Sequence, residues 1–249
     1  MLQTKFISLL IPTYNEVDNI KEILQRSIKV LDSLNVSYEI LVIDDSSRDG
    51  TASAAQSVLV DKGKVIVRSA KERGLSLSII DGIAISNGEY LIIMDADASH
   101  SPELIAEFIF ALQAGYDLVV ASRYIKGGGI ERLPFSRRIT SIAGCLAGSL
   151  LTRVRDNTSG FFCVKKSALE GIEIFPYGFK IGLEIFAKAR YRKFIEIPYI
   201  FIDRVRGKSK LSLKIFIQYL RHFISLFFYT IKKPFFCRLN IRQNNLDKK

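Results

Sequence analysis

The sequence predicts an α/β protein with a mostly parallel sheet and helices on both faces. Three observations support this fold class: short apolar segments alternate with segments of helical period, polar clusters follow several apolar segments, and the composition is that of a globular protein. Of the 249 residues, 48% are hydrophobic and 24% are charged, so the chain can bury a substantial core. These proportions exclude disordered and collagen-like chains.

Five strands are predicted in the first half of the chain, over residues 6–11, 38–43, 64–67, 90–94 and 117–120. Each is a short apolar run followed by polar or turn-forming residues. Segments of helical period lie between them, and the first has its apolar residues at one-face spacing, namely Ile20, Ile23, Leu24, Leu31 and Leu34. Repeated strand-helix-strand units predict parallel strands with helices on both sides of the sheet.

The second half of the chain has a different pattern. A helix rich in small residues is predicted near 139–151, and further strands over 159–164 and 194–202. No linker rich in Pro, Ser or charge interrupts the chain, and there is no internal repeat. Residues 1–210 are therefore expected to form one domain, and residues 211–249 an extension from it.

Charge is distributed unevenly along the chain. The net charge is +11, with −7 carried by residues 1–122 and +18 by residues 123–249. An acidic half is typical of a protein that binds a cation, whereas a basic half is suited to phosphates, nucleic acid or an anionic membrane surface. A solvated basic face without a partner is the alternative.

Cysteine and histidine are too few for several kinds of site. The three cysteines, Cys145, Cys163 and Cys237, are widely scattered, which argues against a disulfide framework or a zinc ribbon and favours a reducing compartment. The two histidines, His100 and His222, are far apart, so a histidine metal site or a Ser-His-Asp triad is not expected. Any metal ion must therefore be held by carboxylates.

Residues 211–233 predict a helix with one polar stripe. Its polar residues recur at spacings of three and four: Lys214, Gln218, Arg221, His222, Ser225, Tyr229 and Lys232. A helix of this length, about 30 Å, could cross a bilayer, but Arg221 near its middle would cost about 2.5–3.5 kcal/mol there. We therefore expect it to lie in a membrane interface, with anionic headgroups meeting Lys232, Lys233, Arg238 and Arg242. A helix packed on its own domain is the alternative.

Two carboxylates follow the predicted strand over 90–94. Asp95 and Asp97 are two residues apart, so in an extended segment their side chains share a face. Such a pair can hold Mg²⁺ or Mn²⁺ and leave coordination positions for a diphosphate. Ligands of open α/β sheets bind beyond the carboxyl ends of the strands, where this pair and the polar turns at 12–16 and 44–51 are expected to meet. The alternative is a solvent-facing turn that happens to contain two acids.

The combination of motifs resembles the family 2 glycosyltransferases, and within them the dolichyl-phosphate (polyprenyl-phosphate) mannose synthase type. The matching segments are Pro12–Glu16 (PTYNE), Asp44–Thr51 (DDSSRDGT), Met94–Pro102 (MDADASHSP), Ser122–Tyr124 (SRY), Thr158–Phe161 (TSGF) and Asp203–Lys210 (DRVRGKSK). The resemblance covers residues 6–230. It implies a GT-A-like catalytic domain over 1–210, with a nucleotide-sugar half over 1–122 and an acceptor half over 123–210, followed by an amphipathic interfacial helix and basic tail over 211–249.

The resemblance implies inverting transfer of mannose from GDP-mannose to dolichyl or polyprenyl phosphate, at the cytoplasmic face of a membrane to which the protein is peripherally bound. An acceptor phosphate with a second pKa of about 6 is already largely ionised, so no general base is needed. The cofactor would be Mg²⁺ or Mn²⁺, which would help to stabilise the departing diphosphate.

The resemblance also assigns roles to individual residues. The nucleotide pocket would be lined by Pro12, Tyr14, Glu16, Ile43 and Asp45. The diphosphate and the metal ion would be bound by Asp95, Ala96 and Asp97, with Asp95 and Asp97 as metal ligands. The cationic contacts to substrate phosphates would be Arg123, Arg137, Arg204 and Lys210, which together with Asp97 form the catalytic set.

Three alternatives stay open at this point. Phe162 and Gly182 depart from the usual pattern of the family near the acceptor side, so a related enzyme that transfers glucose or N-acetylglucosamine to a polyprenyl phosphate is possible. A catalytically silent membrane adaptor with the same fold is the second. A basic nucleic-acid-binding protein is the third; we expect no nucleic-acid partner, because the aromatic residues of the last helix do not alternate with basic ones.

Overall fold

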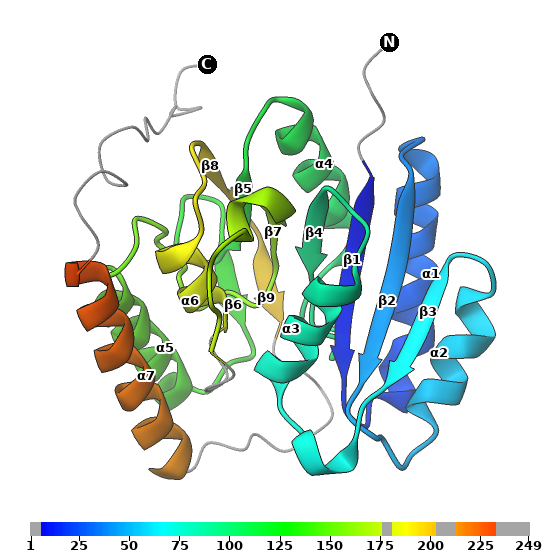
Figure 1. Ribbon diagram of the computed structural model, residues 1–249, viewed down its shortest axis with the longest axis horizontal. Helices are drawn as coiled ribbons and strands as arrows, with labels where there is room; N and C mark the ends of the chain where they lie inside the picture. The colour runs from blue at the N-terminus through cyan, green and yellow to red at the C-terminus, as the bar shows by residue number, and fades with distance from the viewer. Residues whose placement is uncertain (1–5, 176–180, 203–212, 233–249) are drawn as a thin grey trace.

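The computed structural model of the protein describes residues 6–175, 181–202 and 213–232. Among these residues seven strands form one sheet in the order β3-β2-β1-β4-β7-β5-β8 (Figure 1). The strands are β1 (Ile7–Thr13), β2 (Tyr38–Asp44), β3 (Gly63–Val67), β4 (Tyr90–Ile93), β5 (Leu118–Ser122), β7 (Phe162–Lys165) and β8 (Phe194–Pro198). A second, two-stranded sheet pairs β6 (Gly129–Glu131) with β9 (Ile200–Ile202).

The main sheet is parallel except for one strand. β1 runs parallel to β2 and β4, β2 to β3, and β5 to β8, whereas β7 is antiparallel to both of its neighbours, β4 and β5. The prediction of a mostly parallel sheet is therefore confirmed. Because β7 runs in the opposite direction, the chain that enters it lies at the edge where β4 and β5 end.

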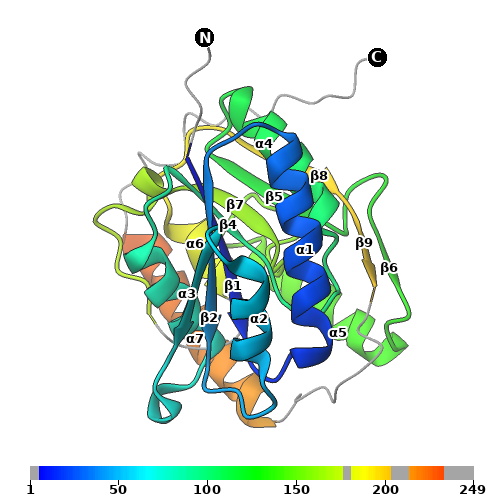
Figure 2. The same cartoon turned by 90° about the vertical axis from the view of Figure 1, so that its right-hand side faces the viewer.

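Helices cover both faces of the main sheet. One face carries α1 (Val17–Ser33), α2 (Thr51–Leu59) and α4 (Ile105–Gln113), and the other carries α3 (Leu75–Ile85) and α6 (Ile181–Lys188). Figure 2 shows the sheet between α1 and α4 on one side and α3 and α6 on the other. Short 3₁₀ turns lie at Ala70–Glu72, Pro102–Leu104 and Lys166–Leu169.

The apolar strands are buried on both faces, which produces two cores. Leu9 and Val42 pack with helices α1, α2 and α4, whereas the adjacent residues Leu10 and Ile43 pack with helices α3 and α6. Successive strand residues point to opposite faces of a sheet, so a near-continuous apolar run is needed where both faces are covered. The apolar runs in the sequence predicted this arrangement correctly.

Two predicted strands have different limits in the structure. The segment 194–202 forms two strands in different sheets. Its first part, β8, pairs with β5 as far as Pro198, and its second part, β9, pairs with β6 from Ile200 onward. Proline has no N–H to continue a ladder, and the N–H of Tyr199 donates to the carbonyl of Ser122. The segment 159–164 is extended only from Phe162; the residues before it form a loop in which Ser159 bonds with the backbone of Phe161.

Two further helices lie at one edge of the molecule, α5 (Phe135–Gly148) and α7 (Leu213–Lys232) (Figure 1). His222 and Leu226 of α7 are buried against the domain, and Leu226 packs with Leu183 of α6 and with Leu151, which follows α5. The outward side of α7 exposes large apolar residues: Leu220, Ile224, Phe227, Phe228 and Ile231. The helix therefore packs on its own domain with one side and presents an apolar surface with the other. Its place in a membrane interface stays a prediction.

In the described part of the chain, every helix is either too short or too polar to span a bilayer.

Candidate active site

The polar ends of the first two strands meet at one edge of the sheet. The N–H of Asp45 donates to the carbonyl of Thr13 at 2.9 Å, and the Thr13 hydroxyl donates to the Asp44 carboxylate at 3.1 Å. Asp44 is fully buried and also accepts from the backbone N–H of Ser47 at 2.8 Å. Its carboxylate thus holds the turn that follows β2, and the predicted convergence of the two polar turns is confirmed.

The turns after β1 and β2 are joined by reciprocal bonds. The N–H of Asn15 donates to the Ser47 hydroxyl at 2.8 Å, and the side-chain carbonyl of Asn15 accepts from the N–H of Arg48 at 3.1 Å. The N–H of Glu16 donates to the Thr51 hydroxyl at 2.9 Å. Asn15 has a φ of 58°, a left-handed conformation that asparagine tolerates better than most residues. The two motifs are therefore one interlocked edge of the site.

Asp45 lies at the centre of a buried polar network. One carboxylate oxygen is 2.5 Å from the Arg68 guanidinium and accepts from the Ser78 hydroxyl at 2.8 Å, and the other accepts from the N–H of Gly74 at 2.8 Å. Arg68 also contacts Asp81 at 2.6 Å. The sequence reasoning missed Arg68, whose position directly after a predicted strand was the only signal available.

The other residues predicted for the nucleotide pocket are distributed between the surface and the core. Tyr14 is partly exposed, and its hydroxyl accepts from Arg73 at 3.1 Å while the guanidinium lies 4.7 Å from its ring centre. Pro12 and Ile43 are buried in the strands beneath this edge. Their contact with a nucleotide stays a prediction.

The acidic pair follows β4, as predicted. Ala96 between the two aspartates is buried, whereas Asp95 and Asp97 are partly exposed. The chain bends over residues 96–98, so the extended segment expected here is not formed. The Asp97 carboxylate accepts from the backbone N–H of Ser99 at 3.1 Å and from its hydroxyl. This short turn fixes the position of the Asp97 carboxylate.

His100 is packed directly behind Asp95. Its Nδ1 accepts from the N–H of Asp95 at 3.2 Å, and its Nε2 lies 4.0 Å from Oδ2 of Asp95. The ring stacks on Phe161 with 5.1 Å between the ring centres. Burial lowers the pKa of His100 to about 4, so the ring is neutral at pH 7. A neutral ring that accepts at Nδ1 carries its hydrogen on Nε2, the nitrogen that faces the carboxylate.

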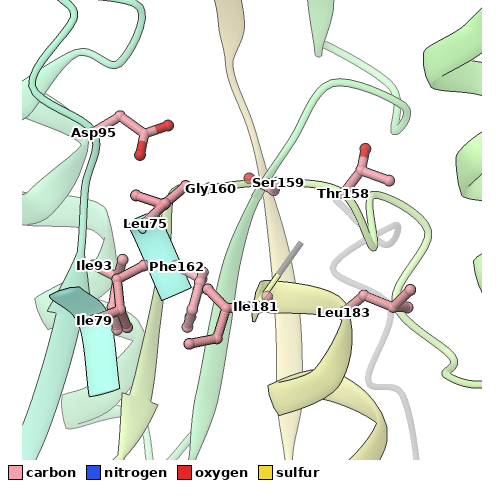
Figure 3. A pocket seen from close by; sticks show the side chains of 11 residues that line it. Leu75, Ile79, Ile93, Asp95, Thr158, Ser159, Gly160, Phe162, Ile181 and Leu183 are labelled. Carbon is pink, nitrogen blue, oxygen red and sulfur yellow. The ribbon is translucent and has the colours of Figure 1, made fainter. Parts of the chain in front are cut away.

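A small pocket of about 90 Å³ lies beside Asp95, between β4, the loop before β7 and α6. Figure 3 shows Asp95 and Thr158 at one end of this pocket and Ile79, Phe162 and Ile181 below them. At Gly160 a Cβ atom would lie 2.7 Å from Oδ2 of Asp95, so a larger residue here would require the carboxylate or the loop to shift. The antiparallel direction of β7 is what brings this loop to the acidic pair.

Arg123 is held by a buried ion pair. Its guanidinium bonds both oxygens of Asp156 at 2.7 Å and the Thr158 hydroxyl at 2.8 Å. Burial acts to lower the pKa of Arg123, but the bonds and the charge of Asp156 outweigh it and raise the pKa above its ordinary value. Arg123 therefore anchors the 156–158 loop in this structure.

The remaining predicted cations are placed as follows. Arg137 lies in the first turn of α5, four residues before Ser141, whose hydroxyl bonds that of Tyr124 at 2.8 Å. Residues at this spacing share a helix face, so Arg137 is on the side of α5 that faces the end of β5. Arg204 and Lys210 lie outside the described residues.

No cluster of three or more His, Cys, Asp or Glu side chains suited to a metal ion occurs within residues 6–175, 181–202 and 213–232. Within these residues the acidic pair is therefore not joined by a third side chain of this kind.

The fold defines the class: it is a GT-A-like α/β fold. Glucosyl-3-phosphoglycerate synthase of Mycobacterium tuberculosis superposes with a TM-score of 0.65, covering 92% of this chain and 82% of that chain at 21% identity. Mannosyl-3-phosphoglycerate synthase of Rubrobacter xylanophilus also gives 0.65, covering 89% and 73% at 17% identity. At these identities the similarity concerns the fold alone.

The chain belongs to glycosyl transferase family 2, whose family model matches residues 8–172. A dolichol-phosphate mannosyltransferase of Pyrococcus furiosus is 41% identical over 224 residues, covering 88% of this chain and 63% of the relative. A protein of the same name from Saccharomyces cerevisiae is 34% identical over 233 residues, covering 88% and 86%. This chain thus spans less than two thirds of the archaeal relative. The family predicted from the motifs is confirmed.

Proposed function

We propose that the protein transfers mannose from GDP-mannose to dolichyl or another polyprenyl phosphate, with inversion at the anomeric carbon. The observation that carries this proposal is the position of Asp95 between the interlocked turns after β1 and β2 and the loop before β7. A donor bound along the turns would place its diphosphate at the acidic pair, facing the acceptor half. The names of the archaeal and yeast relatives support the same reaction and the same acceptor class.

The acidic pair fits a divalent cation. The Asp95 side chain is 34% exposed and borders the pocket, and carboxylate oxygens are the donors that Mg²⁺ and Mn²⁺ prefer. We propose that Asp95 and Asp97 hold the ion and that substrate phosphates complete its coordination. Bound there, the ion would supply a Lewis acid for the departing diphosphate. The M. tuberculosis synthase has been crystallised with Mn²⁺ and UDP, which supports a metal in this fold.

The cationic residues of the second half are proposed to bind the acceptor phosphate. Arg137, Arg204 and Lys210 are assigned to direct contacts, since arginine offers a planar fork of donors and lysine a point charge. Arg123 would reach a phosphate only by sharing the bonds that it makes with Asp156 and Thr158. We therefore assign it mainly to holding the loop beside Asp95. The acceptor half would then cover residues 123–210.

Membrane-surface association is proposed from two helices. α5 exposes Phe135, Ile139, Ile142 and Leu146, Leu150 is exposed just after it, and α7 exposes Leu220, Ile224, Phe227, Phe228 and Ile231, all between 39% and 77%. Both helices lie at the same edge of the molecule (Figure 1), and Leu151, just after α5, packs with Leu226 of α7. Large exposed apolar surface of this kind marks a membrane or protein interaction site. The acceptor carries a polyprenyl tail that stays in the bilayer, so we propose the membrane; its cytoplasmic face is proposed from the family resemblance alone.

The test is a panel of GDP-mannose, UDP-glucose and UDP-N-acetylglucosamine with polyprenyl phosphate in vesicles and either Mg²⁺ or Mn²⁺. We expect lipid-linked mannose only from GDP-mannose, and no product after chelation of the metal. Asp97→Ala should abolish transfer while the circular dichroism spectrum is retained. Lipid-linked glucose or N-acetylglucosamine would replace the donor assignment, and full turnover by Asp97→Ala would overturn the role of the acidic pair.

A further inference from the structure

A buried polar group joins α7 to α6. Glu184 of α6 is fully buried, and its Oε2 lies 2.9 Å from Nε2 of His222 on α7. Its Oε1 accepts from Nζ of Lys188 at 2.5 Å and from the N–H of Phe175 at 2.9 Å. Burial acts to raise the pKa of Glu184, but these bonds outweigh it and the pKa is lowered. The carboxylate is therefore ionised and can only accept, so Nε2 of His222 donates.

Among residues 220–231 of α7, whose side chains the structure describes, the apolar contact with the domain is small. Leu226 is the fully buried apolar residue of this stretch and packs with Leu183 and Leu151, while Phe223 is partly buried beside them. Apolar packing is non-directional and would tolerate rotation of the helix about its axis. The His222 bond is directional and lies one helical turn from Leu226, so the two contacts together define which side of α7 faces inward.

The same turn of α6 also forms part of the pocket. Leu183, adjacent to Glu184, packs against Leu226 and lines the pocket beside Asp95, where Figure 3 shows it next to the loop of Thr158. One side of α6 thus faces the site and the next residue holds α7. This single turn of α6 therefore contacts both α7 and the pocket.

We propose that His222 is a positioning residue: through Glu184 it fixes the rotation of α7, so that the apolar side of the helix and the pocket beside Asp95 face a membrane-borne acceptor in one orientation. This inference rests on the proposed transfer to a polyprenyl phosphate. His222 touches neither donor nor acceptor in this assignment and acts through the placement of the helix.

The first experiment compares two acceptors, a long polyprenyl phosphate in vesicles and a short, water-soluble isoprenyl phosphate. His222→Ala should raise KM for the vesicle-borne acceptor by about tenfold or more, while kcat/KM for the soluble acceptor changes less than about twofold. His222→Gln, which restores a donor to Glu184, should recover most of the loss. Ser225→Ala, an exposed polar position on the same helix, is the matched control and should match the parent protein. An equal loss on both acceptors, or no loss on vesicles, overturns the inference.

A second experiment measures the helix without relying on activity. The chain has no tryptophan, so Phe228→Trp on the outward side of α7 introduces a single probe that vesicles with brominated acyl chains can quench. We expect strong quenching in the parent background and at least a twofold decrease when His222→Ala is added. Phe110→Trp, an exposed position on α4, is the unquenched control. Unchanged quenching in the double variant contradicts the positioning role of His222, whether or not the protein transfers sugar. Failure of the parent protein to transfer sugar contradicts only the proposed function.

Discussion

The imidazole of His100 contacts Asp95 from two sides: Nδ1 accepts from the Asp95 backbone N–H at 3.2 Å, and Nε2 lies 4.0 Å from its carboxylate. The ring cannot shift toward the strand because it is buried and stacked on Phe161. One rigid neutral ring therefore both holds the backbone of Asp95 and lies beside its carboxylate. Residues that orient a ligand in this way commonly matter for metal affinity nearly as much as the ligand itself.

Removal of the ring should weaken the proposed metal site at Asp95. We expect His100→Ala to reduce Mn²⁺ affinity by about 10–100-fold, because the Asp95 backbone loses its acceptor. The affinity can be measured by isothermal titration calorimetry or by electron paramagnetic resonance of free Mn²⁺. His100→Asn, whose side-chain carbonyl can accept the same bond, should retain more affinity than the alanine variant; equal affinity of all three proteins would contradict this role.

Acid should destabilise the protein through the same ring. The pKa of His100 is lowered from 6.5 to about 4 on folding, so the unfolded chain binds a proton at a higher pH than the folded protein does. The free energy of unfolding is therefore not reduced by His100 above pH 6.5. As the pH falls from 6.5 toward 4, protonation of His100 in the unfolded chain lowers it by about 3 kcal/mol.

Urea unfolding at pH 7 and pH 4.5, in the presence of a chelator, measures this effect. The difference in free energy of unfolding between the two pH values should be smaller in His100→Asn than in the parent protein. Subtracting the pH-dependent change of one protein from that of the other removes the contribution of carboxylates that both share. One of these is Glu103, whose pKa is lowered to about 2 mainly by its bond to Arg26.

Gly160→Ala should damage the site more than the fold. The added Cβ would lie 2.7 Å from Oδ2 of Asp95, so either the carboxylate or the loop must move. Insertion of a methyl group into a packed position of this kind costs about 1–3 kcal/mol. We expect metal-dependent activity to fall at least tenfold while thermal unfolding stays cooperative. An unchanged KM for the metal ion would show that the function of Asp95 does not depend on the close approach of the Gly160 loop.

Arg123 and Arg137 should respond differently to removal. Arg123→Ala leaves the buried carboxylate of Asp156 without its partner, which typically costs about 3–5 kcal/mol of stability. Arg137→Ala, in the half-exposed first turn of α5, should cost less than about 1 kcal/mol and should raise KM for the acceptor phosphate. Denaturant unfolding and acceptor kinetics on both variants separate the two roles. A normal stability of Arg123→Ala would instead indicate that its guanidinium is available to substrate.

Much of the fold could be predicted from the sequence because it depends on local patterns. Strands β1 to β5 coincide with short apolar runs, and the direction of most strands follows from the helices between them. The position of Asp95 at a strand end follows from the same patterns, because ligand-binding groups of open α/β sheets gather there. Periodicity and turn chemistry therefore determined the element order, the sheet type and the location of the acidic pair.

The tertiary structure decided which distant residues complete the site. The antiparallel insertion of β7 places Gly160 against Asp95, and the ion pair of Arg123 with Asp156 spans 33 residues of chain. The bond from His222 to Glu184 spans 38 residues and buries a member of the polar stripe of α7. Periodicity records only which side of an element is apolar. The partner of a buried polar group depends on how separate elements pack, and a single sequence carries no local signal for that choice.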